Sequence, residues 1–164
     1  MNVRRVEPGP GQESVWDYPR PPAVENSEKH IMVYFNTVLI ADSTDTKRVL
    51  ETSSPPVYYI PEKDIEMQYL TPSERRTLCE WKGLASYYDI SVNGKSAQNI
   101  AWHYPQPVGE YKQIKDHVAF YPQNMDACYV DGELVTSQPG SFYGGWITTD
   151  IVGPLKGGPG TEGW

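Results

Sequence analysis

Short runs of β-branched and aromatic residues alternate with turn-forming residues along most of the chain. The runs 30–35 and 38–41 are separated only by Asn36-Thr37, which predicts a β-hairpin with a two-residue turn. Asn93-Gly94 and Asp131-Gly132 predict two more turns of this kind, because both dipeptides favour the required backbone conformation. The predicted strands cover residues 30–35, 38–41, 47–50, 57–60, 85–92, 99–104, 117–121, 127–130 and 133–135.

One segment carries the signals of a helix instead. Thr71 as N-cap, Pro72 at the first helical position and Glu74 at the third form a capping box, so we predict a short helix that ends near Leu78. A second short helix is expected at residues 62–66, because Pro61 suits a helix start.

These elements predict a mainly β fold, a single compact antiparallel barrel or sandwich with one or two short helices. The 14 Gly and 15 Pro residues exclude a helical bundle, and the 12 Tyr and 5 Trp residues predict an aromatic core. We expect residues 30–152 to form the β domain. Residues 1–29 are expected to form an extended N-terminal arm, and residues 153–164 a flexible tail rich in Gly and Pro.

Charge and cysteine content limit the partners. The net charge of −7 and the lack of a basic cluster argue against binding to long nucleic acid, although a single nucleotide would still fit. Cys79 and Cys128 match neither a disulfide framework nor a zinc spacing, so we interpret both as free thiols in a reducing compartment. Without a signal sequence or a membrane-length apolar run, the expectation is a soluble cytoplasmic protein.

Five motifs occur along the chain in an unusual combination. They are Glu51-Thr52-Ser53, Val57-Tyr58-Tyr59-Ile60-Pro61, Cys79-Glu80-Trp81-Lys82-Gly83, His117-Val118-Ala119-Phe120-Tyr121-Pro122 and Ser141-Phe142-Tyr143-Gly144-Gly145-Trp146. Through these motifs, residues 30–150 resemble the family called domain of unknown function 427, which also carries the label nucleotidyltransferase. The resemblance implies a small all-β domain in a compact barrel or tent-like arrangement, and it implies little chemistry.

Three charged or polar side chains are candidate catalytic residues. Lys82, with Cys79 as a neighbouring ligand-binding residue, would act as nucleophile or anion ligand, although the same residues also suit a plain helix end before Gly83. Glu51 is a candidate general base, with the alternative that it is a rim residue paired with Arg48. His117 is the third candidate, with a structural histidine as its alternative.

Aromatic residues supply the candidate ligand-binding surface. Strand alternation places His117, Ala119 and Tyr121 on one face, which we expect to line a cavity. The two glycines between Tyr143 and Trp146 indicate a loop whose backbone closely approaches a ligand, with the alternative of a tight turn that plugs the end of the barrel. The remaining predicted ligand-binding residues are Tyr59, Tyr88 and Tyr104.

Three functional hypotheses follow from these residues. The first is a β domain that binds a small polar or aromatic ligand, nucleotide-like molecules included, with Glu51 or His117 transferring protons in an enzymatic version. The second is a non-catalytic interaction module that forms a homodimer through Trp16 and Trp164. The third is a metal-dependent nucleotidyltransferase. We predict no metal residues, because Asp131-x-Glu133 is already explained as a turn and no other metal or phosphate motif occurs. No cofactor is assigned.

Overall fold

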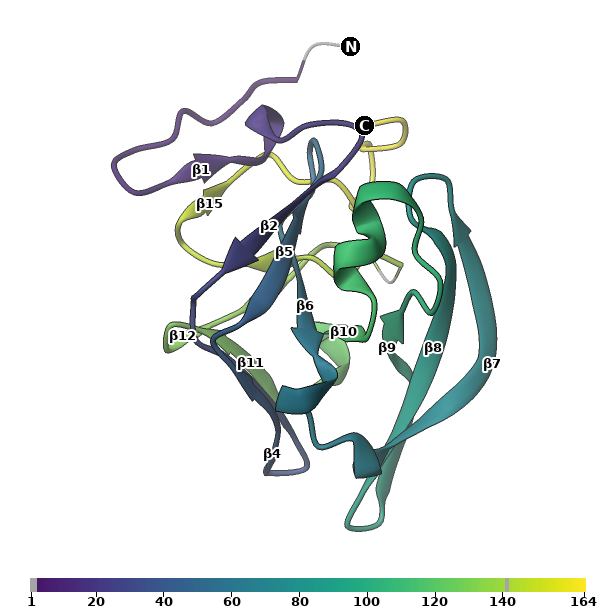
Figure 1. Ribbon diagram of the computed structural model, residues 1–164. Helices are drawn as coiled ribbons and strands as arrows, with labels where there is room; N and C mark the ends of the chain where they lie inside the picture. Colours follow the sequence, from purple (N-terminus) through teal and green to yellow (C-terminus); the bar gives the residue numbers. More distant parts are fainter. Residues whose placement is uncertain (1–2, 141) are drawn as a thin grey trace.

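The computed structural model describes residues 3–140 and 142–164, and most of the regular structure in it is β-strand (Figure 1). Met1 and Asn2 of the expected arm, and Ser141 of the last motif, lie outside the described residues. The largest unit is an antiparallel sheet of 7 strands. Its strands lie in the order β2 (Ala23–Ser27), β5 (Thr46–Leu50), β6 (Val57–Pro61), β10 (His117–Phe120), β9 (Lys95–His103), β8 (Gly83–Val92) and β7 (Leu70–Cys79).

A second antiparallel sheet of 4 strands packs against the first. Its order is β12 (Glu133–Leu134), β11 (Ala127–Val130), β3 (Ile31–Phe35) and β4 (Val38–Ser43). Two short pairs complete the strands: β1 (Glu13–Ser14) with β15 (Ile151–Val152), and β13 (Thr136–Ser137) with β14 (Trp146–Ile147). Within the described residues the sheets stay open, so the predicted mainly β class is confirmed in its sandwich form.

The predicted hairpin turns are confirmed by backbone conformation. Both residues of each turn have positive φ, as a tight turn that follows the right-handed twist of the strands requires. The φ values are 49° and 64° for Asn36-Thr37, 46° and 84° for Asn93-Gly94, and 48° and 81° for Asp131-Gly132.

The predicted helix at 71–78 is wrong, because these residues belong to β7 at the edge of the large sheet. Pro72 pairs with Tyr88 directly before an irregularity in the register between Pro72 and Arg76, and an edge strand tolerates a proline. Only 3-10 turns occur as helical elements in the described residues, and the one after Pro61 is shorter than expected. They are η1 (Val15–Asp17), η2 (Glu62–Asp64), η3 (Met67–Tyr69), η4 (Gly109–Ile114) and η5 (Pro122–Asn124).

Strand alternation separates the two larger of the three clusters of buried side chains. Tyr58 and Phe120 point into the core between the two large sheets, whereas their chain neighbours Tyr59 and Tyr121 point to the opposite face of the 7-stranded sheet. The cluster on that opposite face is mainly aromatic. It consists of Val49, Tyr59, Ala85, Tyr87, Trp102, Tyr104, Tyr111, Ile114, Ala119 and Tyr121.

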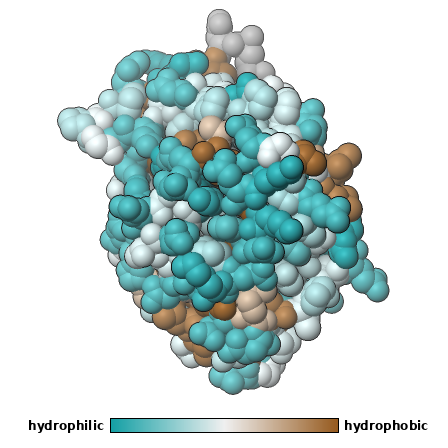
Figure 2. Space-filling view, in the orientation of Figure 1, coloured by the Kyte–Doolittle hydropathy of each residue, from teal (hydrophilic) through white to brown (hydrophobic). Residues whose placement is uncertain are grey.

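The two chain ends lie at the same end of the molecule (Figure 1). Trp16 and Trp164 contact each other edge to face with ring centroids 5.3 Å apart, and Trp16 Nε1 donates to the Pro154 carbonyl at 2.8 Å. The surface shown in Figure 2 is mostly hydrophilic, with hydrophobic residues reaching it in separate patches. None of the described helices is both long enough and apolar enough to span a membrane.

Candidate functional site

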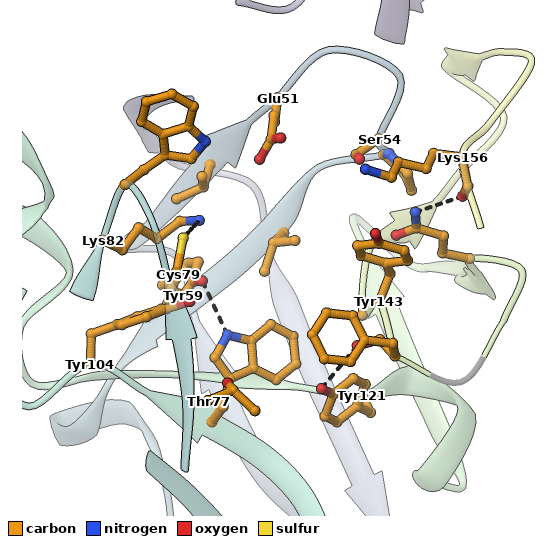
Figure 3. Close-up of a pocket in the computed structure, with 18 of the residues that line it drawn as sticks. Glu51, Ser54, Tyr59, Thr77, Cys79, Lys82, Tyr104, Tyr121, Tyr143 and Lys156 are labelled. Carbon is orange, nitrogen blue, oxygen red and sulfur yellow. Dashed lines mark hydrogen bonds between the residues drawn. The ribbon is translucent and has the colours of Figure 1, made fainter. Parts of the chain in front are cut away.

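A cavity of about 440 Å³ lies over the aromatic face of the 7-stranded sheet. The end of the β7–β8 hairpin forms one side, and the segments around Tyr143 and Lys156 form the other (Figure 3). Most of the residues singled out from the sequence line this cavity. They are Glu51, Tyr59, Cys79, Lys82, Tyr104, Tyr121 and Tyr143.

Lys82 lies in the turn between β7 and β8, where Cys79 pairs with Gly83. Gly83 has a φ of 112°, a conformation that side chains rarely adopt, so a glycine there allows the strand to turn back directly after Lys82. The Lys82 carbonyl accepts a hydrogen bond from Val108 N at 3.2 Å. These contacts hold the lysine backbone in place and direct its side chain into the cavity (Figure 3).

The Lys82 side chain is buried without a carboxylate partner. The residue is 8% exposed, and its Nζ donates to Cys79 Sγ at 3.6 Å. The ammonium also lies 5.7 Å from the Tyr104 ring centroid and 6.0 Å from that of Tyr111. Among the residues that the structure describes, no Asp or Glu forms an ion pair with it. The positive charge is therefore stabilised mainly by a soft sulfur and two ring faces.

Aromatic rings form the floor of the cavity. Trp102 Nε1 donates to the Tyr59 hydroxyl at 3.2 Å, and the Trp102 ring centroid lies 4.5 Å from that of Tyr121. Gly144 packs on the same indole, since a Cβ added there would lie 2.4 Å from the Trp102 ring. The two glycines thus mark a close backbone approach, as predicted, and here it is to a side chain of this chain.

Burial raises the pKa of Tyr59, Tyr104 and Tyr121 above the ordinary value of a phenol. These tyrosines are consequently neutral at pH 7, and their hydroxyls are available as hydrogen-bond donors and acceptors. The floor therefore offers a mainly apolar surface of mutually inclined aromatic rings with a few polar groups, which suits the apolar or aromatic part of a small organic molecule.

Glu51 lies on the rim of the cavity with its carboxylate directed inward (Figure 3). It forms an ion pair with Arg20, whose Nε is 3.3 Å from Glu51 Oε2. The alternative pairing with Arg48 is wrong, because Arg48 is paired with Glu13 at 3.0 Å and with Glu25 at 2.5 Å.

On the side of the cavity opposite Lys82, the predicted residue Tyr143 lies beside Lys156, which the sequence did not single out. Lys156 N donates to the Ser53 carbonyl at 2.8 Å, and the Lys156 carbonyl accepts from Gln138 Nε2 at 2.7 Å. The Lys156 ammonium lies 5.0 Å from the ring centroid of Tyr143. Other lining residues that sequence reasoning missed are Ser54, Thr77, Tyr87, Trp102 and Gln138, whereas Phe142 belongs to the last of the five motifs.

Comparison with known proteins assigns the chain to a family. The family described as domain of unknown function (DUF427) matches residues 23–131, which is most of the chain. The chain belongs to the DUF427 family. The predicted family is thereby confirmed; four of the five motifs lie within the matched residues, and the motif at 141–146 lies beyond them. The description of the family names no activity. No curated protein matches the chain.

Three of the predicted residues lie outside the cavity of this DUF427 protein. His117 Nδ1 is 2.7 Å from the Lys115 carbonyl, at the first residue of β10. Tyr88 stacks on His103 with ring centroids 4.6 Å apart, so the imidazole already covers one face of the Tyr88 ring. Trp146 is 1% exposed in the core between the sheets, where its Nε1 donates to the Phe120 carbonyl at 3.1 Å.

The carboxylates of Asp131 and Glu133 are occupied by backbone groups of this DUF427 chain. Asp131 Oδ1 accepts from His30 N at 2.7 Å, and Glu133 Oε2 accepts from Thr149 N at 2.7 Å. Across residues 3–140 and 142–164, no group of three His, Cys, Asp or Glu side chains gathers in a metal-binding arrangement.

Proposed function

We propose that this DUF427 protein binds a small organic anion in the aromatic cavity, with the anionic group against Lys82. The observation that carries the proposal is Lys82, a residue only 8% exposed, whose ammonium is directed into the cavity and has no acidic partner among the described residues. Burying a charge is costly unless it is paired. A ligand carboxylate or phosphate would supply the missing partner.

The surroundings of Lys82 support an aromatic or otherwise flat ligand body. Under the cavity, the Trp102 ring lies edge to face with Tyr59 at an interplanar angle of 86° and is tilted against Tyr121 by 46°. A volume of about 440 Å³ lies within the range of about 300–1,000 Å³ that is usual for small-molecule sites. Stacking on the rings would hold the flat part, and the neutral hydroxyls would orient its polar groups.

Calorimetry with aromatic carboxylates and with phosphate esters tests the proposal. A ligand at 100 times its Kd stabilises the folded protein by about 2.7 kcal/mol, so a thermal-shift screen can select the probes first. We expect Lys82→Met to lower the affinity at least about tenfold, because a charge-assisted hydrogen bond is lost. Lys115→Met, an exposed lysine outside the cavity, serves as the matched control. Equal affinities for wild type and Lys82→Met would contradict the proposal.

Glu51 supports an enzymatic version of the same site. Its carboxylate is on the cavity rim, and Arg20 holds it in place, so it is the group we propose for proton transfer to a bound ligand. Glu51→Gln would then retain ligand binding and lose turnover. Loss of binding in this variant would assign Glu51 to ligand contact instead.

Nucleotide transfer is tested in the same screen. The family model is named NTP_transf_9, so nucleoside triphosphates with and without Mg²⁺ belong among the probes. A magnesium-dependent shift, followed by nucleotide turnover, would favour transferase activity over simple anion binding. The self-association hypothesis has less support, because Trp16 and Trp164 contact each other within one chain.

A further inference from the structure

We infer that the ligand carries two anionic groups, one at each end of a flat body, and that Lys156 binds the second. The inference rests on the proposed function, since it takes the Lys82 end of the cavity as the first anion site. It extends that proposal to a class of ligand, a flat dicarboxylate, and names the residue that selects it.

Lys156 and Lys82 lie on opposite sides of the cavity. In Figure 3, Lys156 extends from the C-terminal segment toward Ser54 and over Tyr143, whereas Lys82 enters from the β7–β8 hairpin beside Cys79. Both lysines line the cavity, and neither has an ion pair among the residues that the structure describes. The cavity therefore has an unpaired positive charge at each end.

The acidic side chains near the cavity leave both lysines available. Glu51 is held by Arg20 at 3.3 Å, and Glu80 is exposed at the hairpin turn. The cavity lining carries two lysines and two glutamates in a chain whose net charge is −7. Because Glu51 is paired with Arg20 and Glu80 is exposed at the turn, the two lysines are left to bind the anionic groups of a ligand.

The backbone of Lys156 is fixed although it lies in a Gly-rich segment. It donates to the Ser53 carbonyl at 2.8 Å and accepts from Gln138 Nε2 at 2.7 Å. The next residue, Gly157, packs so closely that an added Cβ would lie 2.0 Å from the Pro139 carbonyl oxygen. These contacts place the lysine at the cavity edge before any ligand binds, which lowers the entropic cost of using it as a ligand contact.

The surface between the two lysines determines the shape of the ligand body. Trp102 and Tyr121 lie along the floor with ring centroids 4.5 Å apart, and the neutral Tyr59 hydroxyl accepts from Trp102 Nε1. No charged side chain lies on this floor within the described lining. A flat, unsaturated body is therefore favoured over a flexible polar chain, with charges only at its two ends.

Matched pairs of aromatic acids test the inference by calorimetry on the full chain. The probes are benzoate with terephthalate, 2-naphthoate with 2,6-naphthalenedicarboxylate, and biphenyl-4-carboxylate with biphenyl-4,4′-dicarboxylate. The proteins are wild type, Lys156→Met, Lys82→Met and the control Lys115→Met. We expect at least one dicarboxylate to bind wild type about tenfold or more tightly than its monocarboxylate, because it gains a charge-assisted contact.

Lys156→Met should remove that preference and leave monocarboxylate affinity within about twofold, whereas Lys82→Met should weaken both members of each pair. Circular dichroism and melting of Lys156→Met check that it folds. A dicarboxylate preference that survives Lys156→Met, or no preference in any pair, overturns the inference while the Lys82 site stands. If Lys82→Met changes neither affinity, the proposed function fails as well.

Discussion

Replacement of Lys82 by methionine should make the folded protein more stable. Methionine has a similar unbranched shape and would fill the same space between the rings of Tyr104 and Tyr111 without a charge. The ammonium now contacts Cys79 Sγ at 3.6 Å and the two ring centroids at 5.7 and 6.0 Å. We therefore expect the buried charge to cost more than these contacts return.

The magnitude follows from these contacts. Two cation–π contacts at partly desolvated sites contribute about 1–2 kcal/mol together, whereas the penalty for desolvating an ion is several kcal/mol. The difference predicts a gain of about 1 kcal/mol in the free energy of unfolding for Lys82→Met. In a domain of this size that gain raises Tm by about 2–4 °C.

Calorimetric melting of wild type, Lys82→Met and Lys115→Met without added ligand measures the effect. The exposed control should stay within about 0.5 kcal/mol of wild type. A higher Tm together with lost anion binding would show that Lys82 is kept for function at a cost in stability. A fall in Tm by about 2 °C or more would refute this reasoning, because Lys82 would then be a structural residue that needs no ligand.

Three further predictions concern the thiols, the tail and the tyrosines. Cys79, half-buried in the cavity, should react with iodoacetamide in the folded protein and be protected by a bound aromatic acid. Cys128 should react only after unfolding, because it is 2% exposed and burial raises the pKa of its thiol. Mass spectrometry measures the labelling of both cysteines. Gly157→Ala should lower Tm by more than Gly160→Ala. A Cβ at position 157 would lie 2.0 Å from the Pro139 oxygen, whereas a Cβ at position 160 would lie in open space. Equal Tm shifts for the two variants would contradict the close packing. The pKa values of Tyr59, Tyr104 and Tyr121 are raised in the folded protein, so the stability that these tyrosines contribute is fully present below the unfolded pKa of about 10. This stability is lost as the pH rises above that value, because the unfolded chain then releases the phenol protons more easily. Phenolate absorbance should therefore rise together with unfolding.

The hairpins were predicted correctly because each depends on the backbone conformation of its two turn residues, which the local sequence determines. Asn93-Gly94 must adopt positive φ at both residues to join two strands, and few other dipeptides do so at low cost. The same reasoning predicted alternation in β10, so that Tyr121 was expected on the face that carries the cavity. Neither prediction needs information about distant parts of the chain.

The helix predicted at 71–78 failed because long-range pairing outweighs a local capping pattern. Thr71, Pro72 and Glu74 would suit a helix start, but the segment hydrogen-bonds with β8 as an edge strand and absorbs Pro72 at an irregularity. The consequence for the site is direct. In a strand, Thr77 and Cys79 face the cavity together while Leu78 between them is 80% exposed, and a helix would have separated the first two.

Sequence reasoning found the Lys82 side of the cavity, whereas on the opposite side it found Tyr143 and missed Lys156. Cys79 ends β7, Lys82 lies in the turn to β8, and Tyr104 directly follows β9, which pairs with β8, so the proximity of these residues follows from the strand pairing. Lys156 reaches the cavity only through tertiary contacts, namely the bonds to Ser53 and Gln138. A lysine in a Gly-rich tail carries no periodic signal of such contacts.

Lys82 and Lys156 are held in place by separate parts of the chain, and this affects how the cavity could select between ligands with one and with two anionic groups. The Lys82 end lies within residues 23–131, the part matched by the family, whereas Lys156 lies beyond it. No contact joins the two lysines, and they share no polar partner in the described residues. A change at Lys156 should therefore add to a change at Lys82 rather than depend on it. The strength of anion binding and the preference for a second anionic group would then be set by separate parts of the chain.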